Sequence, residues 1–162
     1  MARVYVGLGS NVDREIKIRQ AVDLLREHFK EIDLSPVYDS AAVGFDGSNF
    51  LNLVAGFDTD LEVAAVAAIF HDIEDQLGRD RTLPKFASRP IDLDILTYDD
   101  IVLDIPGIRI PRPEILHNAF VLKPLQDIAG DRLHPETGES YAALWQRLAP
   151  GAPQLEICKL NL

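Results

Sequence analysis

The sequence contains a single cysteine, Cys158, among 162 residues. An internal disulfide and a metal site built from several cysteines are therefore both excluded. No apolar run approaches the roughly 20 residues that a membrane helix needs, and the apolar run within residues 1–8 is too short for a signal peptide. From these absences we expect a cytoplasmic protein that has no membrane partner.

Basic side chains are also scarce, because 16 Lys and Arg face 26 Asp and Glu and give a net charge of −10. Proteins that bind nucleic acid neutralise its phosphates with basic residues, so this balance argues against a nucleic-acid partner. The glycine patterns of P-loop and dinucleotide sites are absent. The histidines lack the spacing of a metal site, and no serine has a recognisable His–Asp relay in its sequence context.

What the chain does contain is an alternation of strand-like and helix-like apolar patterns. Strands are predicted where apolar residues alternate or run together, and helices where they recur three and four residues apart. In the helix at 59–77 we expect Thr59 and Glu62 to form a capping box and Gly78 to end the helix. The order β-α-β-β-α-β comes from the ranges 4–8, 14–30, 32–38, 50–59, 59–77 and 91–98.

This order predicts an α+β protein with a ferredoxin-like core. The sheet should be mostly antiparallel, with the two helices on one face and the opposite face free for a site. We expect residues 1–162 to form a single domain. The C-terminal additions are predicted as strands at 101–103, 108–110, 120–122 and 154–160, a helical turn at 111–116, and helices at 125–129 and 140–148.

The most informative segment is an acidic strand that follows a basic loop. Side chains alternate along a strand, so Asp92 and Asp94 should share one face, with Cα atoms roughly 7 Å apart. Mg²⁺ prefers such hard oxygen ligands, and guanidinium groups bind phosphate oxygens. An Asp-x-Asp pair alone is usually no more than two solvent-facing acids. Here, however, a metal–triphosphate site is favoured by four preceding cations, Arg79, Arg81, Lys85 and Arg89.

Several motifs occur in order along the chain. They are Gly7-Leu8-Gly9-Ser10-Asn11, Phe50-Leu51-Asn52, Glu74 to Gly78-Arg79, Arg89-Pro90-Ile91-Asp92-Leu93-Asp94-Ile95-Leu96, and Ala119-Phe120-Val121-Leu122 with Pro124-Leu125. With these motifs the sequence resembles, from about residue 4 to 148, the 6-hydroxymethyl-7,8-dihydropterin pyrophosphokinases of folate biosynthesis. The resemblance implies transfer of pyrophosphate from ATP, the co-substrate, to the pterin hydroxymethyl group, with release of AMP and with two Mg²⁺ ions as cofactors.

The resemblance also implies roles for individual residues. Asp92 and Asp94 would hold both metal ions, and Arg79 and Arg89 would act with them in catalysis. The implied pterin-binding residues are Ser40, Val43, Phe50, Asn52, Asp92 and Phe120. The expected ATP-binding residues are His71, Glu74, Arg81, Lys85, Arg89, Ile95 and Arg112. Without the resemblance, Phe120 reads as a core residue and Asn52 as a polar strand residue.

Several positions depart from the family pattern. Arg112 stands where a histidine is usual, Asn118 stands where an arginine is usual, and residues 85–90 replace the usual Arg-Trp-Gly-Pro-Arg-Thr. The departures at 112 and 118 keep open the alternative of a paralogue that binds a pterin or nucleotide without catalysis. A two-metal phosphohydrolase with water as the nucleophile is a second alternative, because it would use the same acids and arginines. We expect the chain to act as a monomer.

Overall fold

The computed structural model describes residues 1–40, 48–78 and 90–162. Within these residues the chain forms a six-stranded sheet in which the paired strands are antiparallel. The strand order is β5-β1-β4-β3-β8, and β2 also pairs with β4. The strands are β1 (Ala2–Ser10), β2 (Asp33–Leu34), β3 (Val37–Ser40), β4 (Phe50–Thr59), β5 (Asp92–Tyr98) and β8 (Glu156–Cys158).

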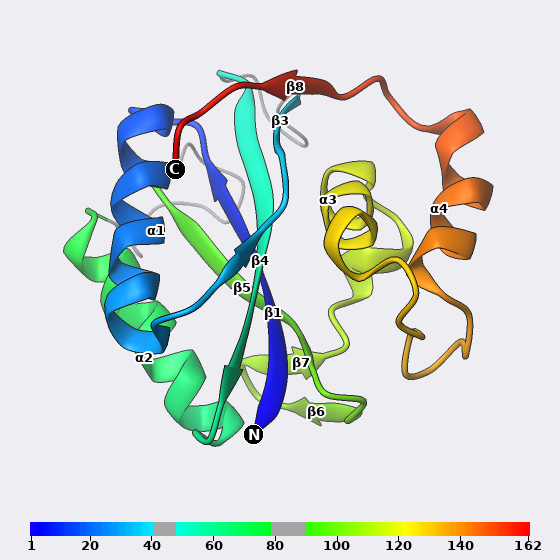
Figure 1. The fold of residues 1–162 in the computed structure, drawn as a ribbon, viewed down its shortest axis with the longest axis horizontal. Coiled ribbons are helices and arrows are strands. Elements are labelled where there is room, and N and C mark those ends of the chain that lie inside the picture. Colours follow the sequence, from blue (N-terminus) through cyan, green and yellow to red (C-terminus); the bar gives the residue numbers. More distant parts are fainter. Residues whose placement is uncertain (41–47, 79–89) are drawn as a thin grey trace.

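Helices cover both faces of this sheet (Figure 1). On one face lie α1 (Arg14–Phe29) and α2 (Val63–Gln76), and on the other lie α3 (Ala119–Ala129) and α4 (Tyr141–Leu148). A hairpin of β6 (Leu103–Ile105) and β7 (Ile108–Ile110) lies beside β5, and the 3-10 turns are η1 (Pro113–Leu116) and η2 (Ala149–Gly151). None of the helices in the described part of the chain is both long and apolar enough to span a membrane.

Alternation along the strands divides the buried side chains between two cores. Val4, Val6 and Leu8 of β1 belong to the core beneath α1 and α2. Tyr5 points to the opposite face and packs, together with Val54, in the core beneath α3 and α4. Because neighbouring side chains on a strand face opposite ways, one apolar strand supplies both cores.

The structure confirms the predicted α+β class and the order of the first six elements. The first two helices share one face, as expected. The opposite face is not free as predicted, because the C-terminal helices cover part of it (Figure 1). The strands predicted at 50–59 and 108–110 are observed within the same bounds, and α4 begins after Ser140, whose side chain accepts a hydrogen bond from the amide of Ala143.

Other elements differ from the sequence prediction. The strand expected at 32–38 is divided into β2 and β3 by Ser35 and Pro36, since proline cannot donate to a ladder. The expected capping box is wrong: the hydroxyl of Thr59 accepts the N–H of Leu61 instead, and α2 begins only at Val63.

The strand predicted at 120–122 is also wrong, because these residues belong to α3, which runs without a break to Ala129. The β-branched and aromatic residues there are typical of a strand. Tertiary packing decides otherwise, since Leu122, Leu125 and Ala129 are buried at helical spacing against the sheet.

Candidate active site

Two glycines of β1, Gly7 and Gly9, leave one face of the sheet without side chains at these positions. Gly9 of β1 pairs with Asn52 of β4 on one side and with Asp92 of β5 on the other. Gly7 pairs in the same way with Val54 and Asp94. A Cβ atom at Gly9 would lie 2.8 Å from Oδ1 of Asn52, which is closer than real Cβ atoms approach. Glycine therefore allows side chains from both neighbouring strands to approach each other above β1.

The sequence pattern predicts that the first strand ends at residue 8 and that Gly9, Ser10 and Asn11 form a turn. The structure extends β1 through Ser10, so Gly9 is a strand residue. Pattern reasoning missed this role of the glycine, because a Gly-Ser-Asn sequence is typical of turns. The signal that could have found it is the Gly-x-Gly spacing, which places both glycines on one face of a strand.

The predicted pterin-binding residues on the strands lie next to each other. Nδ2 of Asn52 donates to Oγ of Ser40 at 3.1 Å, and Ser40 pairs with Phe50 across β3 and β4. Phe120 lies in the first turn of α3, and this helix packs over β4 and β3. The structure thus brings Ser40, Phe50 and Asn52 together and places the helix of Phe120 above the same face.

The predicted carboxylates lie on the same face of β5, as expected. Asp92 and Asp94 are partly buried on the face of the sheet that carries Gly7 and Gly9, which we call the glycine face. Leu93 and Ile95 point into the core on the opposite face. Burial, and after it the nearby charge of Asp92, raise the pKa of Asp94 to about 7. Two crowded carboxylates of this kind form a site that gains stability when a cation neutralises them.

One cation already contacts this pair. Nη2 of Arg112 lies 3.4 Å from Oδ1 of Asp94, and Nε of Arg112 lies 3.1 Å from Oε2 of Glu114. The charge of Arg112 lowers the pKa of Asp94 and so opposes the effects of burial and of Asp92. Glu114 was not predicted, because nothing in its local sequence distinguishes it from a solvent-facing acid in a helical turn.

These residues suit Mg²⁺ better than a metal with an all-protein shell. In the described parts of the chain, no three or more His, Cys, Asp or Glu side chains gather closely enough to hold a metal ion. Mg²⁺ is usually bound by one or two carboxylates, with waters and substrate phosphates completing its octahedron. The donor set of Asp92 and Asp94 fits that requirement.

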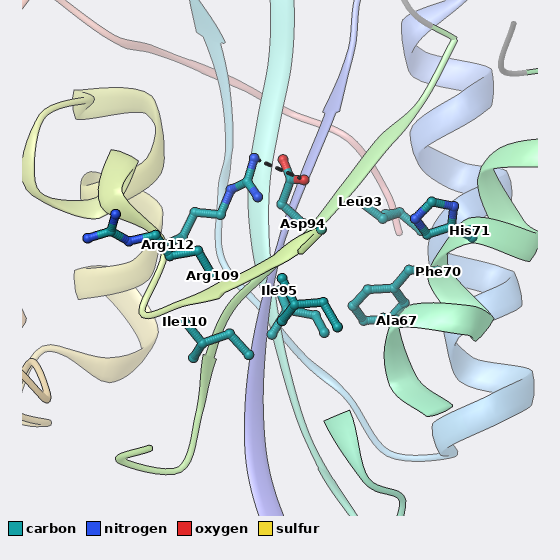
Figure 2. Close-up of a pocket in the computed structure, with 11 residues that line it drawn as sticks. Ala67, Phe70, His71, Leu93, Asp94, Ile95, Arg109, Ile110 and Arg112 are labelled. Atoms are coloured by element: carbon teal, nitrogen blue, oxygen red, sulfur yellow. Dashed lines mark ion pairs between the residues drawn. The ribbon is translucent and has the colours of Figure 1, made fainter. Parts of the chain in front are cut away.

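A pocket open to solvent lies at the outer edge of β5 (Figure 2). One wall is charged, where the guanidinium of Arg112 reaches Asp94, and the other is formed by side chains of α2 (Figure 2). The lining residues are Ala67, Phe70, His71, Leu93, Asp94, Ile95, Gly107, Ile108, Arg109, Ile110 and Arg112.

Three of the predicted ATP-binding residues, His71, Ile95 and Arg112, line this pocket. Glu74 does not line it. Its side chain is only 5% exposed, and its carboxylate accepts the backbone N–H of Leu93 at 2.9 Å. Glu74 therefore supports the strand segment between Asp92 and Asp94. The remaining predicted residues, which lie outside the described residues and stay predictions, are Val43, Arg79, Arg81, Lys85 and Arg89.

Solved structures share this architecture. The "Plasmodium falciparum HPPK-DHPS wild type with SDX-DHP" structure aligns with a TM-score of 0.70 at 13% identity, over 91% of this chain and 43% of that chain. An HPPK-DHPS "in complex with substrates" aligns with a TM-score of 0.74 at 12% identity, over 93% and 44%. These identities establish the fold alone.

Sequence comparison goes further. The family model described as "7,8-dihydro-6-hydroxymethylpterin-pyrophosphokinase (HPPK)" matches residues 5–130. The chain belongs to this family.

Named relatives extend over most of the chain. The Aquifex aeolicus 2-amino-4-hydroxy-6-hydroxymethyldihydropteridine pyrophosphokinase is 37% identical over 83% of this chain and 85% of its own length. The Bacillus subtilis enzyme of the same name is 32% identical over 88% and 90%. The folic acid synthesis protein fol1 of Pneumocystis carinii is 36% identical over 90% of this chain, which spans only 20% of that protein.

Proposed function

We propose that this chain transfers a pyrophosphoryl group from ATP to the hydroxymethyl group of 6-hydroxymethyl-7,8-dihydropterin and releases AMP, in a reaction that requires Mg²⁺. Membership of the HPPK family supports the reaction. The single observation that carries the site assignment is the cross-strand pairing of Gly9 with Asn52 of β4 on one side and with Asp92 of β5 on the other. Across Gly9, an amide that suits a pterin therefore lies near an acid that suits a metal ion.

The pterin is proposed to bind on the glycine face. Its ring edge carries hydrogen-bond donors and acceptors, which the amide of Asn52 and the hydroxyl of Ser40 complement. Phe50 and Phe120 supply aromatic surfaces for stacking against the flat ring. We assign the backbone of Val43 to the same ring edge. Asp92, directly across Gly9 from Asn52, would then face the hydroxymethyl group.

ATP is proposed to occupy the pocket at the edge of β5. Phe70 and Ile95 offer apolar surface for the base, His71 lines the pocket with them, and Arg112 lies at the charged end, where the phosphates would be. Four residues of the basic loop, Arg79, Arg81, Lys85 and Arg89, are proposed to contact the phosphates, and Arg79 and Arg89 to act in the transfer. Guanidinium groups suit this task because they bind phosphate oxygens through paired hydrogen bonds.

In the reaction, the pterin hydroxymethyl oxygen forms a bond to the β-phosphorus of ATP. The bond between the β-phosphorus and the oxygen that bridges to the α-phosphorus breaks, AMP leaves, and the hydroxyl proton passes to solvent. The two Mg²⁺ ions, held by Asp92 and Asp94, would neutralise phosphate charge and lower the pKa of the hydroxyl group. The side chains of the chain itself bind both substrates and align the oxygen with the β-phosphorus.

The test is incubation of the protein with ATP, Mg²⁺ and hydroxymethyl-dihydropterin, with separation of the nucleotides and pterins. We expect equal amounts of AMP and pterin diphosphate, and no product when EDTA removes the metal. AMP with free pyrophosphate in the absence of pterin would instead identify a phosphohydrolase. Tight pterin binding without AMP would identify a non-catalytic paralogue.

A matched pair of variants tests the residues. Asp94→Ala is expected to lower the rate by at least about a thousandfold. It removes a carboxylate that would bind the Mg²⁺ ions, and these ions would neutralise the charge of the reacting phosphates. Asp104→Ala removes an exposed carboxylate of β6 and should keep the wild-type rate. Equal rates in the two variants would contradict the assignment of Asp94. We also propose a cytoplasmic monomer, which size-exclusion chromatography would test at 18.0 kDa.

A further inference from the structure

Arg112 occupies a position that a cation-binding site would be expected to keep open. Its guanidinium lies 3.4 Å from one carboxylate oxygen of Asp94, on the side of β5 where the pocket opens (Figure 2). The neighbouring Arg109 lines the same pocket, but its side chain points away from Asp94 (Figure 2). Asp94 is thus paired with a side-chain cation of its own chain.

The attachment of Arg112 lets the guanidinium move while the backbone stays fixed. The backbone N–H of Arg112 donates to the carbonyl of Leu96 at 2.9 Å, which ties this residue to β5. The side chain itself is 32% exposed, so it is not locked by packing. Glu114 holds the Nε atom at 3.1 Å and gives the guanidinium a second anionic partner when it leaves Asp94.

The charges favour an exchange of partners. A divalent ion placed on Asp94 would repel a guanidinium at this distance, because both are cations close to one carboxylate. A nucleotide polyphosphate brings new oxygens to the same pocket, and Arg112 can bind them without moving its backbone. Displacement of Arg112 from Asp94 makes metal binding weaker. The new contact between Arg112 and the phosphates offsets this cost when the nucleotide binds.

We infer that Arg112 is an exchangeable counter-ion, which pairs with Asp94 before a divalent ion binds and moves to the polyphosphate of the nucleotide afterwards. The inference rests on the proposed function, because it takes Asp94 as a metal ligand. Arg112 accordingly weakens metal binding in the absence of nucleotide and strengthens nucleotide binding in the presence of metal. A residue that only supports the fold would not act in opposite directions on these two affinities.

The test compares Arg112→Gln with the wild-type protein in two calorimetric titrations. With Mn²⁺ alone as the probe, we expect the variant to bind about threefold to tenfold more tightly, since a nearby positive charge has been removed. With the non-hydrolysable analogue α,β-methylene-ATP at saturating Mg²⁺, we expect the variant to bind about tenfold more weakly. Unchanged or weaker Mn²⁺ binding by Arg112→Gln would overturn the inference.

Two control variants separate charge from shape. Arg112→Lys keeps the positive charge, so its Mn²⁺ affinity should stay near that of the wild-type protein. Arg109→Gln removes a charge from the same pocket without touching Asp94, so its effect on Mn²⁺ binding should be smaller than that of Arg112→Gln. An equal effect of Arg109→Gln would contradict a specific exchange at Asp94. Failure of the proposed function would be recognised separately, as the absence of AMP release by the wild-type protein.

Discussion

The side chain of Asp94 is held in the folded chain at a pKa of about 7, well above its ordinary value of 3.8. The folded state therefore binds a proton more readily than the unfolded state. The contribution of this group to stability is fully present below about pH 4 and is lost as the pH rises through about 7. At neutral pH and without metal, the carboxylate destabilises the fold.

Asp94→Asn should consequently stabilise the metal-free protein while abolishing activity. In EDTA at pH 8, we expect the variant to melt about 2–4 °C higher than the wild-type protein, an estimate that allows for solvent screening of a partly exposed group. The difference should vanish toward pH 4, where both side chains are neutral. Thermal unfolding at the two pH values provides the measurement, and an equal or lower melting temperature at pH 8 would contradict this explanation.

The position of Gly9 has no room for a side chain beside Asn52. A methyl group there would lie 2.8 Å from Oδ1 of Asn52, so the amide must move away from the position proposed to bind the pterin. Gly9→Ala should weaken pterin binding at least about tenfold, or 1.4 kcal/mol. Gly151→Ala is the matched control, because nothing lies within 4 Å of a Cβ at that position. Pterin affinity measured by fluorescence should fall in the first variant only.

The sequence could predict the facing of Asp92 and Asp94, because alternation along a strand follows from backbone geometry alone. It could not predict that Arg112 reaches Asp94, since their contact joins two separate elements and depends on where the chain returns to β5. The functional roles of Phe120 and Asn52 came only from the family resemblance. Their local patterns are those of ordinary core and strand residues.

Among the elements, prediction succeeded where periodicity and packing agree. The helix α1 was predicted within one residue of its observed end, because its buried residues fall at regular helical spacing. The prediction failed at α3, where local propensity favours a strand and the tertiary structure imposes a helix. Short segments of this kind carry too few residues for a period to be recognised.

The connection between α3 and α4 contains a buried histidine that makes its stability depend on pH. His134 is 1% exposed, and its Nδ1 accepts the N–H groups of Glu136 and Thr137 at 3.1 and 3.2 Å. Both hydrogen bonds require the neutral ring. Burial lowers the pKa of His134 below its ordinary 6.5. The stabilisation is therefore complete above about pH 6.5 and is lost as the pH falls through the pKa of the folded state.

We expect the amide protons of Glu136 and Thr137 to lose protection by about tenfold or more between pH 7 and pH 5, relative to their intrinsic exchange rates. Amides in the middle of β4 provide the internal control, because they do not contact His134. Hydrogen exchange read by NMR provides the measurement. Protection factors that stay constant for Glu136 and Thr137 would contradict a neutral His134 as their acceptor.

In the molecule as a whole, the two faces of the sheet carry different side chains. The face toward α1 and α2 is filled by apolar side chains. The face toward α3 and α4 is apolar near Tyr5 and becomes polar toward Gly9, where Asn52 and Asp92 flank the strand. The element order predicted the fold class, but it could not show that the C-terminal helices cover this second face, because the pattern of a helix does not identify its partner.

Asp92 and Asp94 are proposed to hold divalent ions against the phosphates of a nucleotide. Anomalous scattering from crystals grown with Mn²⁺ and α,β-methylene-ATP would locate these ions. We predict two manganese peaks within coordination distance of these carboxylates, with nucleotide density in the pocket between α2 and β7. Bound nucleotide with manganese elsewhere, and with both carboxylates remote from any ion, would show that Asp92 and Asp94 are not the metal ligands.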